Sequence, residues 1–154
     1  MNDTLSKIKI GAIVFSFFVL VVALMGISYV RANYYMKDQI RAYVTNNMPS
    51  DLSGEERKKK ATSLATEFAK KPEQVAITIA TISICFLLAG YVAGSKSSSH
   101  INAAIAAISG SLLFSPISIR SVTFWMTIIV GLAFALIGSK FAIHKKQRNL
   151  AAGS

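Results

Sequence analysis

Side chains that perform catalysis or bind metals are few in this chain, and they lie far apart. There is one cysteine, Cys85, and there are two histidines, His100 and His144. Neither histidine has a cysteine or carboxylate neighbour at the spacing of metal ligands. No nucleophile elbow, zinc-protease motif or phosphate-binding glycine loop occurs. We therefore expect no catalytic residue, no cofactor and no metal site.

The distribution of acidic residues argues against ion-coupled transport. All 7 acidic residues precede Gln74. Proton-coupled carriers and pumps generally need a carboxylate or a histidine at membrane depth. Cys85 lies in an uncharged stretch, where a small packing residue is expected rather than a reactive thiol, because hydrocarbon disfavours the thiolate.

Four uncharged runs dominate the sequence, at 10–30, 74–95, 97–119 and 121–139. About 20 apolar residues are needed for a helix to cross the hydrocarbon core of a bilayer, and the backbone must be helical there. The runs predict an all-α integral membrane protein, folded as a single polytopic domain over residues 1–154. Its four transmembrane helices are expected at about 9–31, 73–95, 100–117 and 121–143. Pro72 indicates the start of the second helix, because the first turn of a helix tolerates proline, and Pro116 and Arg120 indicate the turn between the third and the fourth.

The segment 32–72 between the first two spans is expected to form an extramembrane helical hairpin. Its first part continues the first span with a helical stripe of Met36, Ile40, Tyr43 and Val44, until Pro49 interrupts it. Ser53 and Glu56 then have the spacing of a capping box, which predicts a second helix to about Lys70. Its apolar stripe is Ala61, Leu64, Ala65 and Phe68. This stripe either lies on lipid headgroups or packs on the extended first helix.

Small residues recur every four positions in the second and third spans, and this spacing places them on common helix faces. Small side chains allow helix backbones to approach one another closely in lipid. The predicted helix-interface residues are Gly90, Gly94, Ala103, Ala106, Ala107, Gly110 and Ser111. The interface is either the hairpin of these two spans or a contact with another molecule, by self-association or with another membrane protein.

The formal net charge of +10 arises from basic residues that flank the spans. Lipid headgroups and topology explain this charge, and we expect no nucleic-acid partner. A C-terminal group, Lys140, Lys145, Lys146 and Arg148, is expected to contact lipid headgroups or to anchor the topology. On the side of the two termini, the basic residues lie directly beside the span ends, which favours that side as cytoplasmic. A simple count of basic residues instead favours the side of the long loop as cytoplasmic. We expect the cell (inner) membrane, with both termini cytoplasmic.

One stretch resembles a known family. Glu56, Arg57, Lys60, Ala61 and Glu67 resemble the E-R-x-x-R-A-x-x-N-x-x-E motif of the four-span glutathione and eicosanoid membrane enzymes. The chain departs from that motif, since Leu64 replaces the asparagine and Lys60 an arginine. The resemblance covers about a dozen residues and implies an enzyme that acts on an amphipathic substrate.

Three functional hypotheses follow. The first is a non-enzymatic integral membrane protein that serves as an assembly, accessory or structural subunit through small-residue helix interfaces. The alternative is an oligomeric channel or passive carrier with hydroxyl-lined faces. The third is a four-span membrane enzyme acting on an amphipathic substrate.

Overall fold

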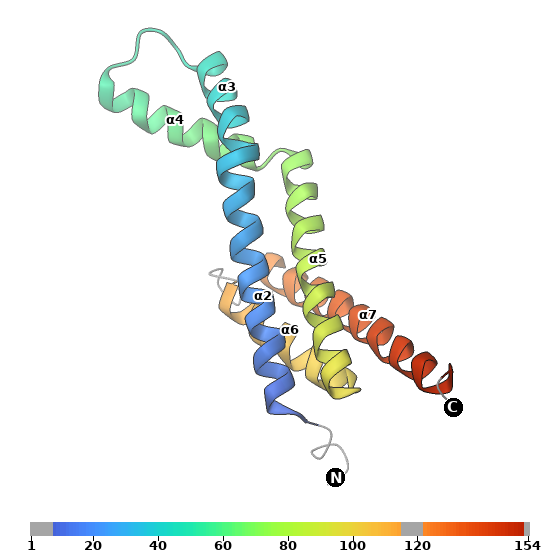
Figure 1. Cartoon of the computed structure of the whole chain (residues 1–154). Helices are drawn as coiled ribbons and strands as arrows, with labels where there is room; N and C mark the ends of the chain where they lie inside the picture. Colours follow the sequence, from blue (N-terminus) through green and yellow to red (C-terminus); the bar gives the residue numbers. More distant parts are fainter. Residues whose placement is uncertain (1–7, 115–121, 153–154) are drawn as a thin grey trace. The chain divides into compact units, whose positions relative to one another are not determined.

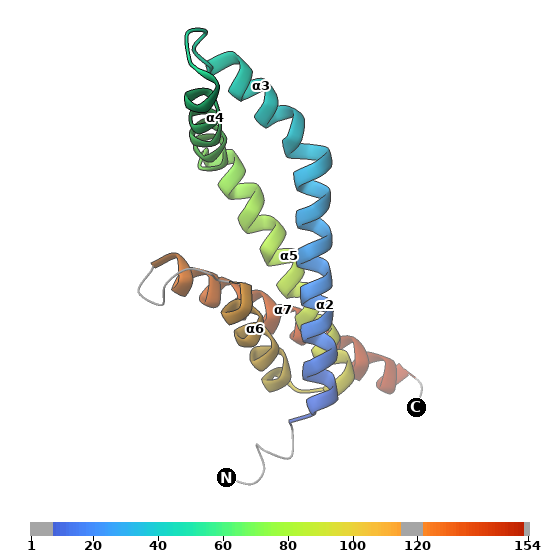
Figure 2. The same cartoon turned by 90° about the vertical axis from the view of Figure 1, so that its left-hand side faces the viewer.

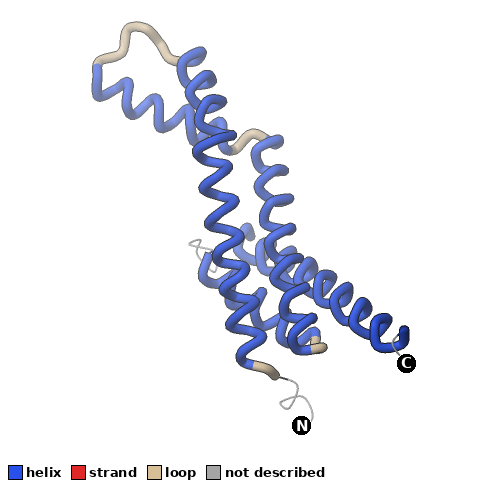
Figure 3. Tube along the Cα trace, viewed as in Figure 1, coloured by secondary structure: helices blue, strands red, loops and turns tan. Residues whose placement is uncertain are grey.

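The computed structural model describes residues 8–114 and 122–152, and every regular element in those ranges is helical. The elements are α2 (Ile10–Val30), η1 (Arg31–Met36), α3 (Lys37–Asn47), α4 (Gly54–Ala69), α5 (Pro72–Ser97), α6 (His100–Phe114) and α7 (Val122–Ala152). Short loops join α3 to α4, α4 to α5 and α5 to α6 (Figure 3). The predicted all-α class is confirmed.

Three helices are long and apolar enough to cross a membrane. They cover Ile10–Asn47 with 38 residues, Pro72–Ser97 with 26 and Trp125–Ala152 with 28. The third predicted span is not confirmed, because α6 has 15 residues and a length of only about 22 Å. The rest of the predicted 100–117 span, with the turn expected at Pro116 and Arg120, lies outside the described residues.

The chain divides into two compact units. Unit 1 comprises residues 1–24 and 82–154, and unit 2 comprises residues 25–81. The boundaries fall inside the continuous helices α2 and α5. Each unit has its own packing.

The first helix continues without a break from Ile10 to Asn47, as the sequence predicted. Its middle section, η1, is a π-helix, in which each backbone N–H bonds five residues back rather than four. The helix ends just before Pro49, and Met48 is already extended, with φ −84° and ψ 121°. This matches the preference of a residue before proline for extended backbone.

Unit 2 contains the predicted helical hairpin, in which α4 packs against α3 (Figures 1 and 2). The rings of Tyr43 and Phe68 are 5.4 Å apart between centroids, and the Tyr43 hydroxyl donates to Glu67 at 3.1 Å. The Lys71 ammonium lies 4.1 Å from the centre of the Tyr43 ring. The apolar stripe of α4 therefore packs on the extended first helix.

The local signals for α4 and α5 are confirmed. Ser53 caps α4 and forms the complete capping box with Glu56. This arrangement satisfies backbone N–H groups that have no partner within the first helical turn. Pro72 begins α5, a position that tolerates proline because the N–H it lacks would be unpaired there.

Unit 1 combines the first part of α2, most of α5, and helices α6 and α7. Helix α2 buries residues at four-residue intervals: Ala12, Ser16, Leu20 and Leu24. Ser98 makes the short turn between α5 and α6 with a left-handed φ of 54°, and its N–H donates to the Gly94 carbonyl at 2.9 Å. Helix α7 runs to Ala152, so the basic segment beyond the expected span end at 143 is helical.

Candidate functional site

A close backbone contact in unit 1 joins α5 to α7. A Cβ added at Gly90 would collide with the backbone carbonyl of Ala135, and one added at Gly94 would lie 2.7 Å from the Ser139 carbonyl oxygen. From the other side, a Cβ at Gly138 would collide with the Leu87 carbonyl. From the Gly90–Ala135 contact to the Gly94–Ser139 contact, the residue number rises by four in both helices, so α5 and α7 run in the same direction. Only glycine permits this approach.

The remaining predicted interface residues belong to α6, and all five are buried: Ala103, Ala106, Ala107, Gly110 and Ser111. Helix α6 packs on α7, and Gly110 adjoins the Leu20 side chain of α2 and the Phe86 ring of α5. All seven predicted residues thus contribute to packing within one chain. The sequence placed small faces on α5 and α6 and left their partner open between the hairpin of these two helices and another molecule, whereas Gly90 and Gly94 contact α7.

The residues that complete these contacts were not predicted from the sequence. In α7, Ala135 and Ser139 repeat the four-residue spacing of small residues that singled out α5 and α6. In α2, Ser16 is fully buried and its hydroxyl donates to the Ala89 carbonyl at 2.6 Å. The regular spacing of small or apolar residues was the available signal for both.

A polar layer forms where α5 ends and α6 begins. His100 Nδ1 lies 2.9 Å from the Ser139 hydroxyl of α7, and Lys146 Nζ donates to the Ser98 hydroxyl, also at 2.9 Å. The backbone N–H of Lys9 donates to the Asn102 amide oxygen at 3.0 Å. These bonds bring the start of α2, the α5–α6 turn and the basic part of α7 together within unit 1.

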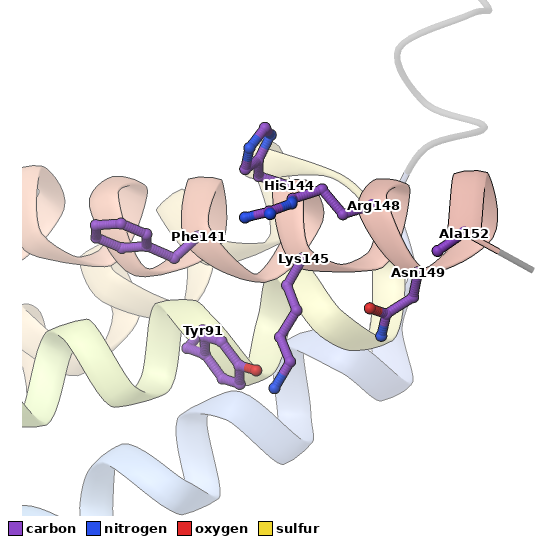
Figure 4. Close-up of a pocket in the computed structure, with 7 residues that line it drawn as sticks. All are labelled: Tyr91, Phe141, His144, Lys145, Arg148, Asn149 and Ala152. Carbon is purple, nitrogen blue, oxygen red and sulfur yellow. The ribbon is translucent and has the colours of Figure 1, made fainter.

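The predicted C-terminal basic group lies on one exposed stretch of α7. Lys145 and Arg148 line a pocket of about 570 Å³ together with Tyr91 of α5 (Figure 4). Lys146 lines an adjoining pocket of about 350 Å³. Lys140 lines neither pocket. Three of the four basic residues therefore line these two pockets, and Lys140 does not.

Unit 2 contains a half-buried arginine. Arg31 Nη1 donates to the Thr78 hydroxyl at 2.6 Å, and Nη2 donates to the Gln74 carbonyl at 3.0 Å. The buried Gln74 amide adds a contact to Nη2 at 3.3 Å and donates to Gln39 at 3.4 Å. This cluster connects the first helix to the start of α5 and coincides with the first residue of the π-helix.

The residues that resemble the membrane-enzyme motif lie on the surface of α4. Arg57, Lys58, Lys59 and Lys60 are all exposed. Lys59 and Lys60 line a shallow pocket of about 380 Å³ with Glu56, but Arg57 and Lys58 do not.

Within residues 8–114 and 122–152, the side chains of His, Cys, Asp and Glu form no group of three that could hold a metal ion. Cys85 is buried. No protein family, curated protein or solved structure matches the chain.

Proposed function

We propose that this protein is a small non-enzymatic integral membrane protein that serves as an assembly or accessory subunit. The observation that carries the proposal is the outer face of α6. This face exposes the Ser109 hydroxyl between the exposed side chains of Ile108 and Leu112. A hydroxyl on an apolar helix gains a partner when a second helix packs over it, and lipid tails offer none.

The close packing of unit 1 supports this role. Glycine contacts join α5 to α7, and α6 buries its small residues beside them. The small faces are already occupied within the chain, so they provide a rigid support for the exposed face of α6. A helix that is held in place loses less conformational freedom when a partner binds.

Two buried hydroxyl groups of unit 1 favour an assembly role over a channel. Ser16 donates to the Ala89 carbonyl, and Ser97 donates to the Ala93 carbonyl at 2.6 Å. Both groups are bonded to helix backbone inside unit 1 and are not directed at a path for solutes. Proteoliposomes should therefore stay impermeable to ions and small solutes. Protein-dependent flux through these vesicles would favour the channel alternative.

For the membrane arrangement, we propose four spans, of which the third contains α6. The polar layer supports this arrangement, because it gathers Lys9, the α5–α6 turn and Lys146 at one end of unit 1. Basic residues at one end are typical of a cytoplasmic boundary. A reporter fused to the C-terminus should give the signal of the cytoplasmic side of the cell (inner) membrane. A signal from the external side would contradict this topology.

Site-directed crosslinking tests the assembly proposal. The Ser109→Cys variant should crosslink to a second copy or to one companion membrane protein in the native membrane. Ile79→Cys is the control, because Ile79 is exposed on α5 and its own side chain is entirely hydrocarbon. Light scattering in mild detergent should give a mass above that of the 16.6 kDa chain in its detergent micelle. A monomer without a Ser109→Cys crosslink would contradict the proposal.

A further inference from the structure

Two adjoining pockets form a groove along the last turns of α7. The larger pocket, of about 570 Å³, and the smaller one, of about 350 Å³, share Tyr91, Lys145 and Asn149. Figure 4 shows Lys145 extending from α7 toward the Tyr91 hydroxyl on α5. Both walls of the groove belong to unit 1. The groove therefore does not depend on the placement of unit 2.

The groove has cations and no carboxylate side chain to pair with them. Lys145, Lys146 and Arg148 line it, whereas no Asp or Glu lines either pocket. The sequence after Glu73 contains no acidic residue at all. Clustered cations repel one another, so an external anion between them lowers their energy. Guanidinium and ammonium groups are the usual protein partners of phosphate oxygens.

The same groove has an apolar side. Phe141 in the larger pocket is 64% exposed, and Leu150 in the smaller one is 68% exposed. Phe141 lies two residues after the end of the uncharged run at 121–139, with Lys140 between them. A ligand that contacts both sides must carry a negative charge and an apolar chain. Inorganic phosphate supplies only the charge.

We propose that this groove is a binding site for the headgroup of an anionic phospholipid. Lys145 and Arg148 hold the phosphodiester, and the Tyr91 hydroxyl and the Asn149 amide donate to its oxygens or to the polar headgroup. The acyl chains leave along Phe141. The site joins the end of α7 to α5 through the lipid, which goes beyond the general attraction between a basic tail and a charged surface.

Binding of short-chain phosphatidylglycerol to the full-length protein in a mild, uncharged detergent tests the site. Calorimetry should show saturable binding of phosphatidylglycerol, and weaker binding of the matching phosphatidylcholine and of inorganic phosphate. The Lys145→Gln/Arg148→Gln double variant should bind phosphatidylglycerol about tenfold more weakly, because each near-surface cation contributes to anionic lipid binding. Tyr91→Phe removes only the hydroxyl and should weaken binding a few-fold.

The matched control is Arg57→Gln/Lys58→Gln, which removes one arginine and one lysine from the exposed surface of α4. It should bind phosphatidylglycerol as the wild type does. Equal losses in the two double variants would show general charge attraction and overturn the site. Equal affinity for phosphatidylcholine would overturn the anionic preference, and equal affinity for inorganic phosphate would overturn the lipid. Unchanged helical content and elution volume exclude misfolding of the variants.

Discussion

Gly90 on α5 lies directly against the backbone carbonyl of Ala135 on α7, with no room for a single methyl group between them. The obstacle is backbone, which cannot rotate away as a side chain does. Helices without a water-driven hydrophobic effect between them depend on such close approach for their association. The contact between α5 and α7 therefore requires glycine at position 90.

Gly90→Ala should destabilise the protein by about 3 kcal/mol, at the upper end of the cost of overpacking, because the helices must separate. Unfolding in mixed detergent micelles, followed by circular dichroism, measures the loss. The matched control is Gly11→Ala on α2, where the added Cβ meets nothing within 4 Å. Equal stability of the two variants would contradict the α5–α7 contact.

Gly110 and Leu20 give a contact of a different kind. A Cβ at Gly110 collides with the end of the Leu20 side chain, which is flexible. Gly110→Ala should therefore cost about 1 kcal/mol, less than Gly90→Ala. In the double variant Gly110→Ala/Leu20→Val, the shorter side chain should recover part of that loss. Strictly additive effects in the double-mutant cycle would show that α2 and α6 do not meet at this point.

Local signals predicted local structure well. Ser53 and Glu56 indicated the start of α4, and Pro72 indicated the start of α5, because caps depend on residues within one helical turn. The apolar stripe that contains Phe68 was also correct, but its partner on α3 was left open. The sequence showed which residues form a face and could not show which helix covers it.

The partner of Gly90 illustrates the same limit. Spacing of four residues identifies a small helix face, yet nothing in that spacing distinguishes α6 from α7 as the neighbour. The choice depends on contacts between segments that are distant in sequence, such as Gly94 with Ser139. The π-helix that begins at Arg31 also had no recognised signal. For the third span, α6 accounts for 100–114 of the predicted 100–117, and the remaining positions lie outside the described residues.

Ser16 should contribute to stability through its hydroxyl. Ser16→Ala leaves the buried Ala89 carbonyl without its hydroxyl donor, and we expect a loss of about 1 kcal/mol, in the range of interhelical hydrogen bonds in membranes. The same detergent unfolding measurement applies. Ser109→Ala removes an exposed hydroxyl from α6 and should leave monomer stability unchanged. A Ser16→Ala variant as stable as the wild type would show that this bond contributes nothing.

The capping box of α4 should make the start of that helix sensitive to acid. Hydrogen bonds from the Ser53 hydroxyl and backbone N–H lower the pKa of the Glu56 carboxyl from its ordinary value. The folded helix start thus binds the Glu56 proton less tightly than the unfolded one. Its contribution to stability is complete above the unfolded pKa of about 4.3 and is lost as the pH falls through the lower, folded value.

Titration of Glu56 by NMR in the full-length protein should show this lowered pKa, and Ser53→Ala should return the pKa toward the ordinary value. In the wild type, the amide protection of Gly54 and Arg57, corrected for intrinsic exchange, should decrease as the pH is lowered through the range in which Glu56 titrates. Glu55→Gln removes a charge from the same helical turn but outside the capping box, and it should leave the pH range of this decrease in protection unchanged. A Glu56 titration that does not respond to Ser53→Ala would show that the capping box is not formed in solution.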